Sequence, residues 1–256
     1  MPVAEVHSGP VPVHRFDVIG SLNARTRCVE HVGLSLEDRN LIAGPQSPLR
    51  IVDMAPPISE RMADDRFLRH LVGTADLTPE VDIGVLELLE NFVAETSGPI
   101  EPQSLTSDFP LSEEHINFFV FTIHPHMVSG SGDEDDEVRP TRYSCAGYVH
   151  EGYRRAKLPL LDVESLPELT FEQISRADPR LRAARISEPE LLAWTGINGE
   201  GSWPVMMPGY LIASLNRSGD DIRRTPYQPR PADITFPPSA PANEAAPDPL
   251  PGSPSA

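Results

Sequence analysis

The chain has 256 residues, of which 21 are basic and 38 are acidic, so its formal net charge is −17. A chain this acidic repels phosphate backbones, which argues against a nucleic-acid partner. Two cysteines are too few for a disulfide framework or for a zinc site made of four thiolates. No apolar run is long enough to span a bilayer, and no secretory signal is visible at the start, so we expect a protein of the reducing cytoplasm.

The length suits one large domain or two small ones. We expect an N-terminal arm over 1–14 and a single α+β domain over 15–237, with a helical insertion at about 59–96. Residues 238–256 are rich in proline, alanine and serine, which predicts a disordered tail.

The first part of the domain is predicted to begin with short strands. Apolar runs indicate strands at 16–19, 31–36 and 49–52, and a polar turn at 37–40 follows the second of them. Apolar residues near helical spacing then predict a helix over 59–72.

A second helix is predicted to begin at Thr78 and Pro79, because threonine is a good N-cap and proline suits the first turn. The Thr-Ser-Gly-Pro run at 96–99 marks its end. The run Asn-Phe-Phe-Val-Phe-Thr-Ile at 117–123 predicts a buried strand, and 129–142 is predicted to be a polar loop. The elements expected further on are a helix from Cys145 to about Lys157, helices near Thr170 and at Ser187, a loop at 195–201 and a strand at 209–215.

Cys145 stands at the front of the amphipathic helix that follows the polar loop. A helix N-terminus stabilises a thiolate through its unpaired N–H groups and its macrodipole, and the same N–H groups can bind an oxyanion. Cys145, Val149, Gly152 and Ala156 share one helix face, which we expect to turn toward the core. The alternative is a buried structural cysteine on a packed helix.

A histidine on a predicted strand is the second group with chemical potential. His31 begins the run His-Val-Gly-Leu, and an imidazole close to a thiol can act as its general base. The alternative is a histidine on a half-buried strand without a catalytic role.

The segment Ser-Cys-Ala-Gly-Tyr-Val at 144–149, followed by Tyr153 and Leu158-Pro159, resembles the nucleophile helix of the NlpC/P60 family of papain-like cysteine peptidases. The run at 31–34, preceded by Phe-Asp-Val-Ile at 16–19, is similar to the histidine strand of that family. Because the histidine precedes the cysteine, the order is that of the circularly permuted branch. The resemblance implies a papain-like α+β fold, with an antiparallel sheet packed on the nucleophile helix.

The family normally orients its histidine with a third polar residue, and family spacing places this residue near Ala43. Alanine cannot serve, so Asn40 and Gln46 are the nearby candidates. We take Cys145 as nucleophile, His31 as base and Asn40 as the third residue.

The resemblance implies a cysteine hydrolase or acyltransferase that acts on an amide or ester bond, with a peptide or a lipid ester as substrate and with no cofactor or metal. The alternative is a catalytically inactive papain-like module that binds a protein partner through its acidic surface or its tail. An unrelated fold with coincidental motifs is a third possibility.

Three other features have weaker interpretations. His124 and His126 resemble a zinc-chelating pair, but Pro125 interrupts the strand, and His124 is also an alternative base for Cys145. The acidic run 133–137 lacks the spacing of a calcium loop and predicts a solvated loop that could cover the thiol as a lid. The run 230–236 is similar to a strand of the family, and we treat it as coincidence or as a small extra strand.

Overall fold

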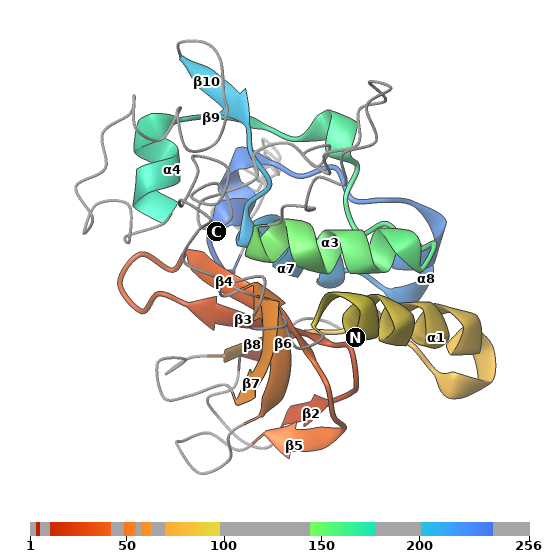
Figure 1. Cartoon of the computed structure of the whole chain (residues 1–256). Coiled ribbons are helices and arrows are strands. Elements are labelled where there is room, and N and C mark those ends of the chain that lie inside the picture. The colour runs from red at the N-terminus through yellow and green to blue at the C-terminus, as the bar shows by residue number, and fades with distance from the viewer. Residues whose placement is uncertain are drawn as a thin grey trace, which may run out of the picture.

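The computed structural model describes residues 4–5, 11–41, 49–54, 58–62, 70–97, 144–177 and 201–237. Within them the chain forms an α+β arrangement in which helices cover an antiparallel sheet (Figure 1). The expected α+β class is therefore confirmed.

The main sheet has six strands in the order β1-β8-β3-β4-β6-β7, and all its pairings are antiparallel. Two further ladders, β2–β5 and β9–β10, have two strands each. The strands are β1 (Ala4–Glu5), β2 (Val11–Val13), β3 (Val18–Leu22), β4 (Val29–Ser35), β5 (Arg39–Leu41), β6 (Arg50–Met54), β7 (Ile58–Met62), β8 (His70–Gly73), β9 (Glu168–Thr170) and β10 (Ser202–Pro204).

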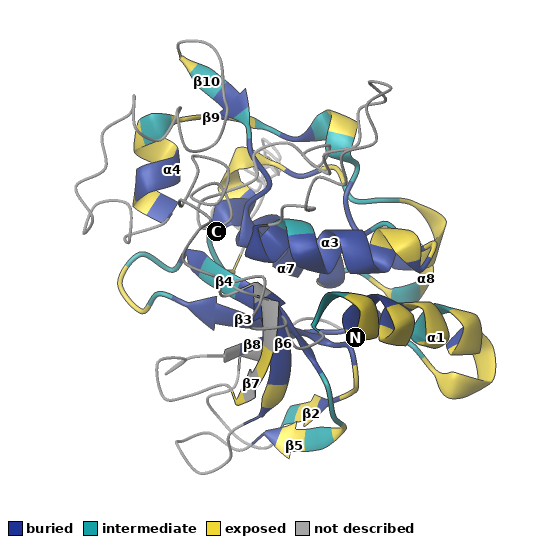
Figure 2. Cartoon of the chain, in the orientation of Figure 1, coloured by how far each residue is buried: buried dark blue, intermediate teal, exposed yellow. Residues whose placement is uncertain are grey.

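The helices α3 and α7 pack on the sheet, where both contact β4, and α1 packs on α3. Figure 2 shows that α3 and α7 are largely buried, whereas α1 has one buried and one exposed side. The helices are α1 (Pro79–Thr96), α3 (Cys145–Arg155), α4 (Phe171–Ala177), α7 (Pro208–Leu215) and α8 (Gly219–Arg224), with short 3₁₀ turns η2 (Val163–Ser165) and η3 (Pro231–Ile234).

The sheet has an apolar cluster on each face, because side chains alternate along a strand. Val32 and Leu34 of β4 belong to the large cluster that includes the helices. Ile19, Ile51 and Val72 belong to a smaller cluster that also contains residues of the β2–β5 ladder. The sheet is thus buried on both faces, and its main core lies under α3 and α7.

The helix that begins at Cys145 is confirmed, and its start has a clear local cause. The Ser144 hydroxyl accepts a hydrogen bond from the backbone N–H of Gly147 at 2.9 Å, which is an N-cap. Two arginines in the last turn suit the negative end of the helix dipole. The expected burial of the face with Cys145, Val149 and Gly152 is also observed.

The helix expected from Pro79 to the Thr-Ser-Gly-Pro run is confirmed as α1. Thr78 occupies the N-cap position, but its side chain makes no capping bond. Instead, the carboxylate of Asp82 accepts a hydrogen bond from the Thr78 N–H at 2.9 Å, and Asp82 also pairs with Arg223 of α8.

The expected helix over 59–72 is wrong, because the residues described at the two ends of this range form the strands β7 and β8. β7 pairs with β6, and β8 pairs with β3. Leu71 and Val72 pack on opposite faces of the sheet, which is a period of two and not of a helix. The helical insertion at about 59–96 therefore shrinks to α1, because cross-strand pairing overrides the local spacing.

The expected strand at 209–215 is also wrong, because Pro208–Leu215 is the helix α7. All eight of its residues are buried, so the segment has no polar face to reveal a helical period. The 230–236 run contains the 3₁₀ turn η3 and makes only an isolated bridge from Thr235 to Cys28.

The expected arm over 1–14 contains β1 and β2, each paired within a sheet. The predictions for 117–123, 129–142, Ser187 and the tail 238–256 fall outside the described residues. Among the helices that are described, none combines the length and the apolar character needed to cross a membrane.

Gly152 allows α3 and α1 to approach closely. A Cβ at this position would lie 2.9 Å from a ring carbon of Phe92 on α1. We expect Gly152→Ala to lower the free energy of unfolding by about 1–3 kcal/mol, because the helices must move apart. Urea denaturation measures this. Gly84→Ala is the matched control, because no atom lies within 4 Å of a Cβ there and alanine favours the helix; equal destabilisation by both variants would contradict this packing.

Asp17 is predicted to make stability depend on pH. Burial raises the pKa of its carboxyl from 3.8 to about 6, although the His14 N–H donates to it at 2.7 Å. The stabilisation is therefore complete below pH 3.8 and is lost as the pH rises through about 6. Asp17→Asn stays neutral, so its free energy of unfolding relative to the wild type should increase by roughly 2–3 kcal/mol between about pH 4 and about pH 8. The same difference at both pH values would refute this role of Asp17.

Candidate active site

Three elements converge on the candidate site. β4 carries His31, the neighbouring strand β6 carries Asp53, and the first residue of α3 is Cys145. α3 packs against both β4 and β6. The sheet and the helix thus bring together residues that are far apart in the sequence.

His31 forms a short contact with Asp53, with 2.6 Å between Nε2 and Oδ2. The Asp53 side chain is fully buried, and that of His31 is 12% exposed. A carboxylate oxygen can only accept, so the protonated Nε2 donates. The bond fixes the ring and leaves Nδ1 as the nitrogen that can serve another group.

Cys145 acts on the same imidazole. Burial opposes the charged form of His31, but the charge of Cys145 and the hydrogen bond that His31 donates to Asp53 outweigh it, and Cys145 is itself hydrogen-bonded to His31. Together these groups raise the pKa of His31 from 6.5 to about 9. The arrangement therefore favours the imidazolium form of His31 at neutral pH, and an adjacent imidazolium is the kind of group that stabilises a thiolate.

Gly33 makes room for the aspartate. Asp53 is the cross-strand partner of Gly33, two residues after His31 on β4, so His31 and Asp53 are diagonal neighbours on one face. A Cβ on Gly33 would lie 2.9 Å from the Cβ of Asp53. Steric crowding by Asp53 thus explains why the His-Val-Gly run has glycine at this position.

A register shift lies directly beside the histidine. His31 pairs with Ser21, but Val29 pairs with Leu22, so Glu30 is an extra residue in β4. Such a bulge increases the local twist of a strand and redirects the adjoining side chains. It is the irregular feature of β4 closest to His31.

Of the three expected site residues, Cys145 and His31 lie together, but Asn40 does not join them. Asn40 is exposed and belongs to β5, where it pairs with Pro12 of β2. In the main sheet β4 lies between β3 and β6, whereas β5 belongs to a different ladder. The residue bonded to His31 is accordingly Asp53, which the sequence analysis missed.

One sequence signal points to Asp53. It is an acidic residue within a short apolar run, after Ile51 and Val52 and before Met54. A buried carboxylate in such a strand requires a partner. The other expected groups, His124, His126 and the acidic run 133–137, lie outside the described residues.

No group of three or more His, Cys, Asp or Glu residues in the described ranges is arranged to hold a metal ion. The other cysteine, Cys28, is buried and has a free thiol, and its backbone forms the isolated β-bridge to Thr235. The candidate site itself contains a thiol, an imidazole and a carboxylate.

The fold and the site define an α+β protein with a Cys–His–Asp cluster between a helix front and an antiparallel sheet. Comparison with protein-family models, with curated proteins and with solved structures gave no match. The functional argument therefore depends on the geometry of the cluster.

Asp53→Asn tests the charge relationship. It retains a hydrogen-bond acceptor but removes the negative charge, so the pKa of His31 should fall from about 9 by roughly 1 to 3 pH units. NMR titration of the imidazole nitrogens measures the value. Asp38→Asn is the control, because this aspartate is exposed and lies near His14 instead. An unchanged His31 titration in Asp53→Asn would rule out the proposed coupling.

Proposed function

We propose that the protein is a thiol-dependent hydrolase or acyltransferase that acts on an amide or ester carbonyl. The observation that carries the proposal is the chain of contacts from Cys145 to His31 to Asp53. A thiolate needs a cation to stabilise it, and an imidazolium needs a carboxylate to hold it in place. The site contains both partners.

In the proposed reaction, the Cys145 sulfur attacks the substrate carbonyl carbon and forms a C–S bond. Backbone N–H groups at the front of α3 stabilise the oxyanion. The intermediate collapses to a thioester and expels an amine or alcohol, which takes its proton from His31. Water, or an acceptor alcohol or amine, then gives a proton to neutral His31 and attacks the thioester through its oxygen or nitrogen. The C–S bond breaks, which releases the acyl group from the thiol.

Asp53 has a positioning role in this scheme. Its bond to Nε2 directs Nδ1 of His31 toward the thiol and stabilises the positive ring. Because the carboxylate is fully buried, water does not screen this interaction.

The catalytically inactive module is the second candidate. Its basis is the lack of a suitable polar residue near Ala43. Asp53 supplies a candidate for that role from a different strand, which favours the enzyme.

We also propose a papain-like fold of the permuted NlpC/P60 type, which the helix-front cysteine and the strand histidine support. Peptides and lipid esters are both substrates of the proposed chemistry.

The test is turnover of p-nitrophenyl esters and peptide anilides by the wild type, Cys145→Ala and Cys28→Ala. We expect Cys145→Ala to lower kcat/KM by about a thousandfold or more, because the nucleophile is lost. Cys28→Ala is the matched control, because it removes the other buried thiol and leaves the cluster intact. Turnover that survives in Cys145→Ala, or no turnover by the wild type of any ester or amide, would reject the enzyme and favour the binding module.

A further inference from the structure

Tyr210 on α7 has a buried hydroxyl with no hydrogen-bond partner among the described residues. The residue is fully buried, so water does not reach the hydroxyl. A buried polar group left without a partner costs free energy and calls for an explanation. Burial raises the pKa of Tyr210, so the phenol remains a neutral O–H donor.

The other tyrosines of the described core are different. The Tyr148 hydroxyl lies 2.9 Å from the Thr96 hydroxyl, and the Tyr153 hydroxyl donates to the Phe16 carbonyl at 2.8 Å. The Tyr227 hydroxyl donates to the Asp233 carboxylate at 2.7 Å. Tyr148, Tyr153 and Tyr227 thus each have a hydrogen-bond partner for the hydroxyl, whereas Tyr210 has none among the described residues.

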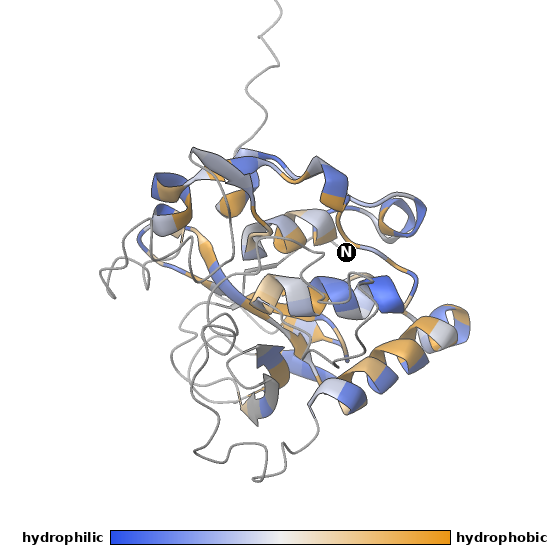
Figure 3. Cartoon of the chain, turned by 45° about the horizontal axis from the view of Figure 1, so that its top comes forward, coloured by the Kyte–Doolittle hydropathy of each residue, from blue (hydrophilic) through white to orange (hydrophobic). Residues whose placement is uncertain are grey.

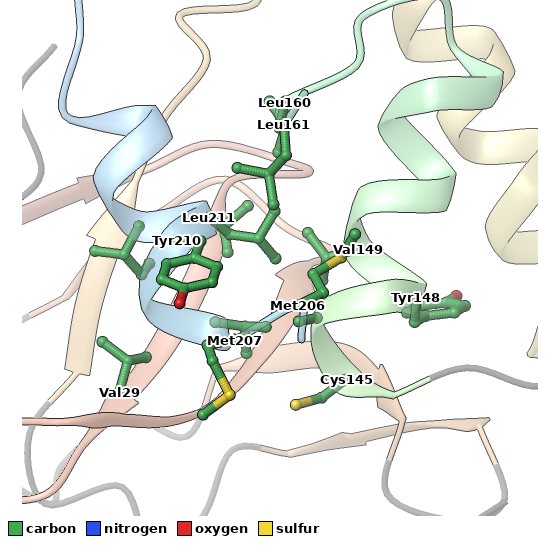
Figure 4. Packing of buried hydrophobic residues seen from close by; sticks show 14 of the residues in the cluster. Val29, Cys145, Tyr148, Val149, Leu160, Leu161, Met206, Met207, Tyr210 and Leu211 are labelled. Atoms are coloured by element: carbon green, nitrogen blue, oxygen red, sulfur yellow. The ribbon is translucent and has the colours of Figure 1, made fainter. Parts of the chain in front are cut away.

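The unpartnered hydroxyl lies close to the candidate active site. α7 packs against α3, which carries Cys145, and against β4, which carries His31. In Figure 4 the Tyr210 hydroxyl points toward Met207, and the Cys145 sulfur points toward the same methionine from the other side. In this view Met207 lies between the thiol and the hydroxyl, and all three residues belong to one apolar cluster.

Met207 is suited to give way to a ligand. It is 1% exposed and belongs to the same apolar cluster as Cys145 and Tyr210. An unbranched thioether has several rotatable bonds and repacks more readily than a branched side chain. Displacement of Met207 would therefore leave room beside the Cys145 thiol for an apolar group (Figure 4).

We propose that Tyr210 determines the acyl specificity of the thiol site by donating a hydrogen bond to an oxygen on the substrate's acyl group. The acyl group is apolar next to its carbonyl, where it replaces the Met207 side chain, and it carries a carbonyl, ether or hydroxyl oxygen further along. This inference rests on the proposed thiol chemistry and adds the class of acyl group. A site built to bond such an oxygen discriminates against the analogue that lacks it.

The test compares p-nitrophenyl alkanoates with oxoalkanoates of the same length, in which a carbonyl replaces one methylene. The wild type should prefer one oxoalkanoate in kcat/KM, and Tyr210→Phe should lower this preference about tenfold. The ratio within each enzyme removes any general loss of activity. Met207→Ala should shift the preference toward longer alkanoates, because the smaller side chain leaves more room for the acyl group.

Tyr148→Phe is the matched control. Its hydroxyl is bonded to Thr96 and lies across α3 from the Cys145 sulfur (Figure 4). It should lower the thermal midpoint without changing the ratio, whereas Tyr210→Phe should change the ratio without lowering the midpoint. Equal loss of stability in both variants would overturn the proposal, because Tyr210 would then have a partner within the protein.

The two proposals fail in different ways. No turnover of either ester by the wild type rejects the thiol chemistry and the Tyr210 assignment together. Cys145-dependent turnover with a ratio that Tyr210→Phe leaves unchanged rejects the Tyr210 assignment alone.

Discussion

The hydrogen bond between His31 and Asp53 is the interaction on which the rest of the site depends. A fully buried carboxylate is costly without a partner, so the 2.6 Å bond ties the register of β4 and β6 to the position of the imidazole. Gly33 lets Asp53 approach the neighbouring strand, and a slip of one residue would turn Asp53 to the other face of the sheet. Sheet register and site geometry are therefore one constraint.

The two ends of α3 differ in polarity. Figure 3 shows that its hydropathy changes from apolar at one end to hydrophilic at the other. At the hydrophilic end, the buried carboxylate of Glu151 accepts bonds from Arg154 and Arg155 at 2.6 and 3.0 Å. The apolar end sits on β4 and β6, so the Cys145 thiol is directed at the sheet and the charged end remains near solvent.

Local patterns in the sequence predict the parts of this structure that depend on local physics. The Ser144 cap and the Pro79 start are short-range features, and both helices begin where the sequence places them. The spacing of apolar residues does not reveal α7, because all of its residues are buried and a helix without a polar face resembles a strand in sequence.

The third site residue depends on long-range pairing instead. Asn40 is close to His31 in sequence, but β5 pairs with β2, and β6 takes the place beside β4. Which strand adjoins the histidine is decided by the packing of the whole sheet, and spacing along the chain does not contain that information. The same reason accounts for β7 and β8, whose pairing replaces an expected helix.

The pH dependence of Cys145 alkylation in the wild type and in His31→Ala tests the central claim most directly. Mass spectrometry of the alkylated peptides separates Cys145 from Cys28. An imidazolium that stabilises the thiolate predicts rapid alkylation well below the pKa of a free thiol, about 8.5, and loss of this low-pH reactivity in His31→Ala. An apparent pKa near that of a free thiol, the same in both proteins, would contradict a functional Cys145–His31 pair.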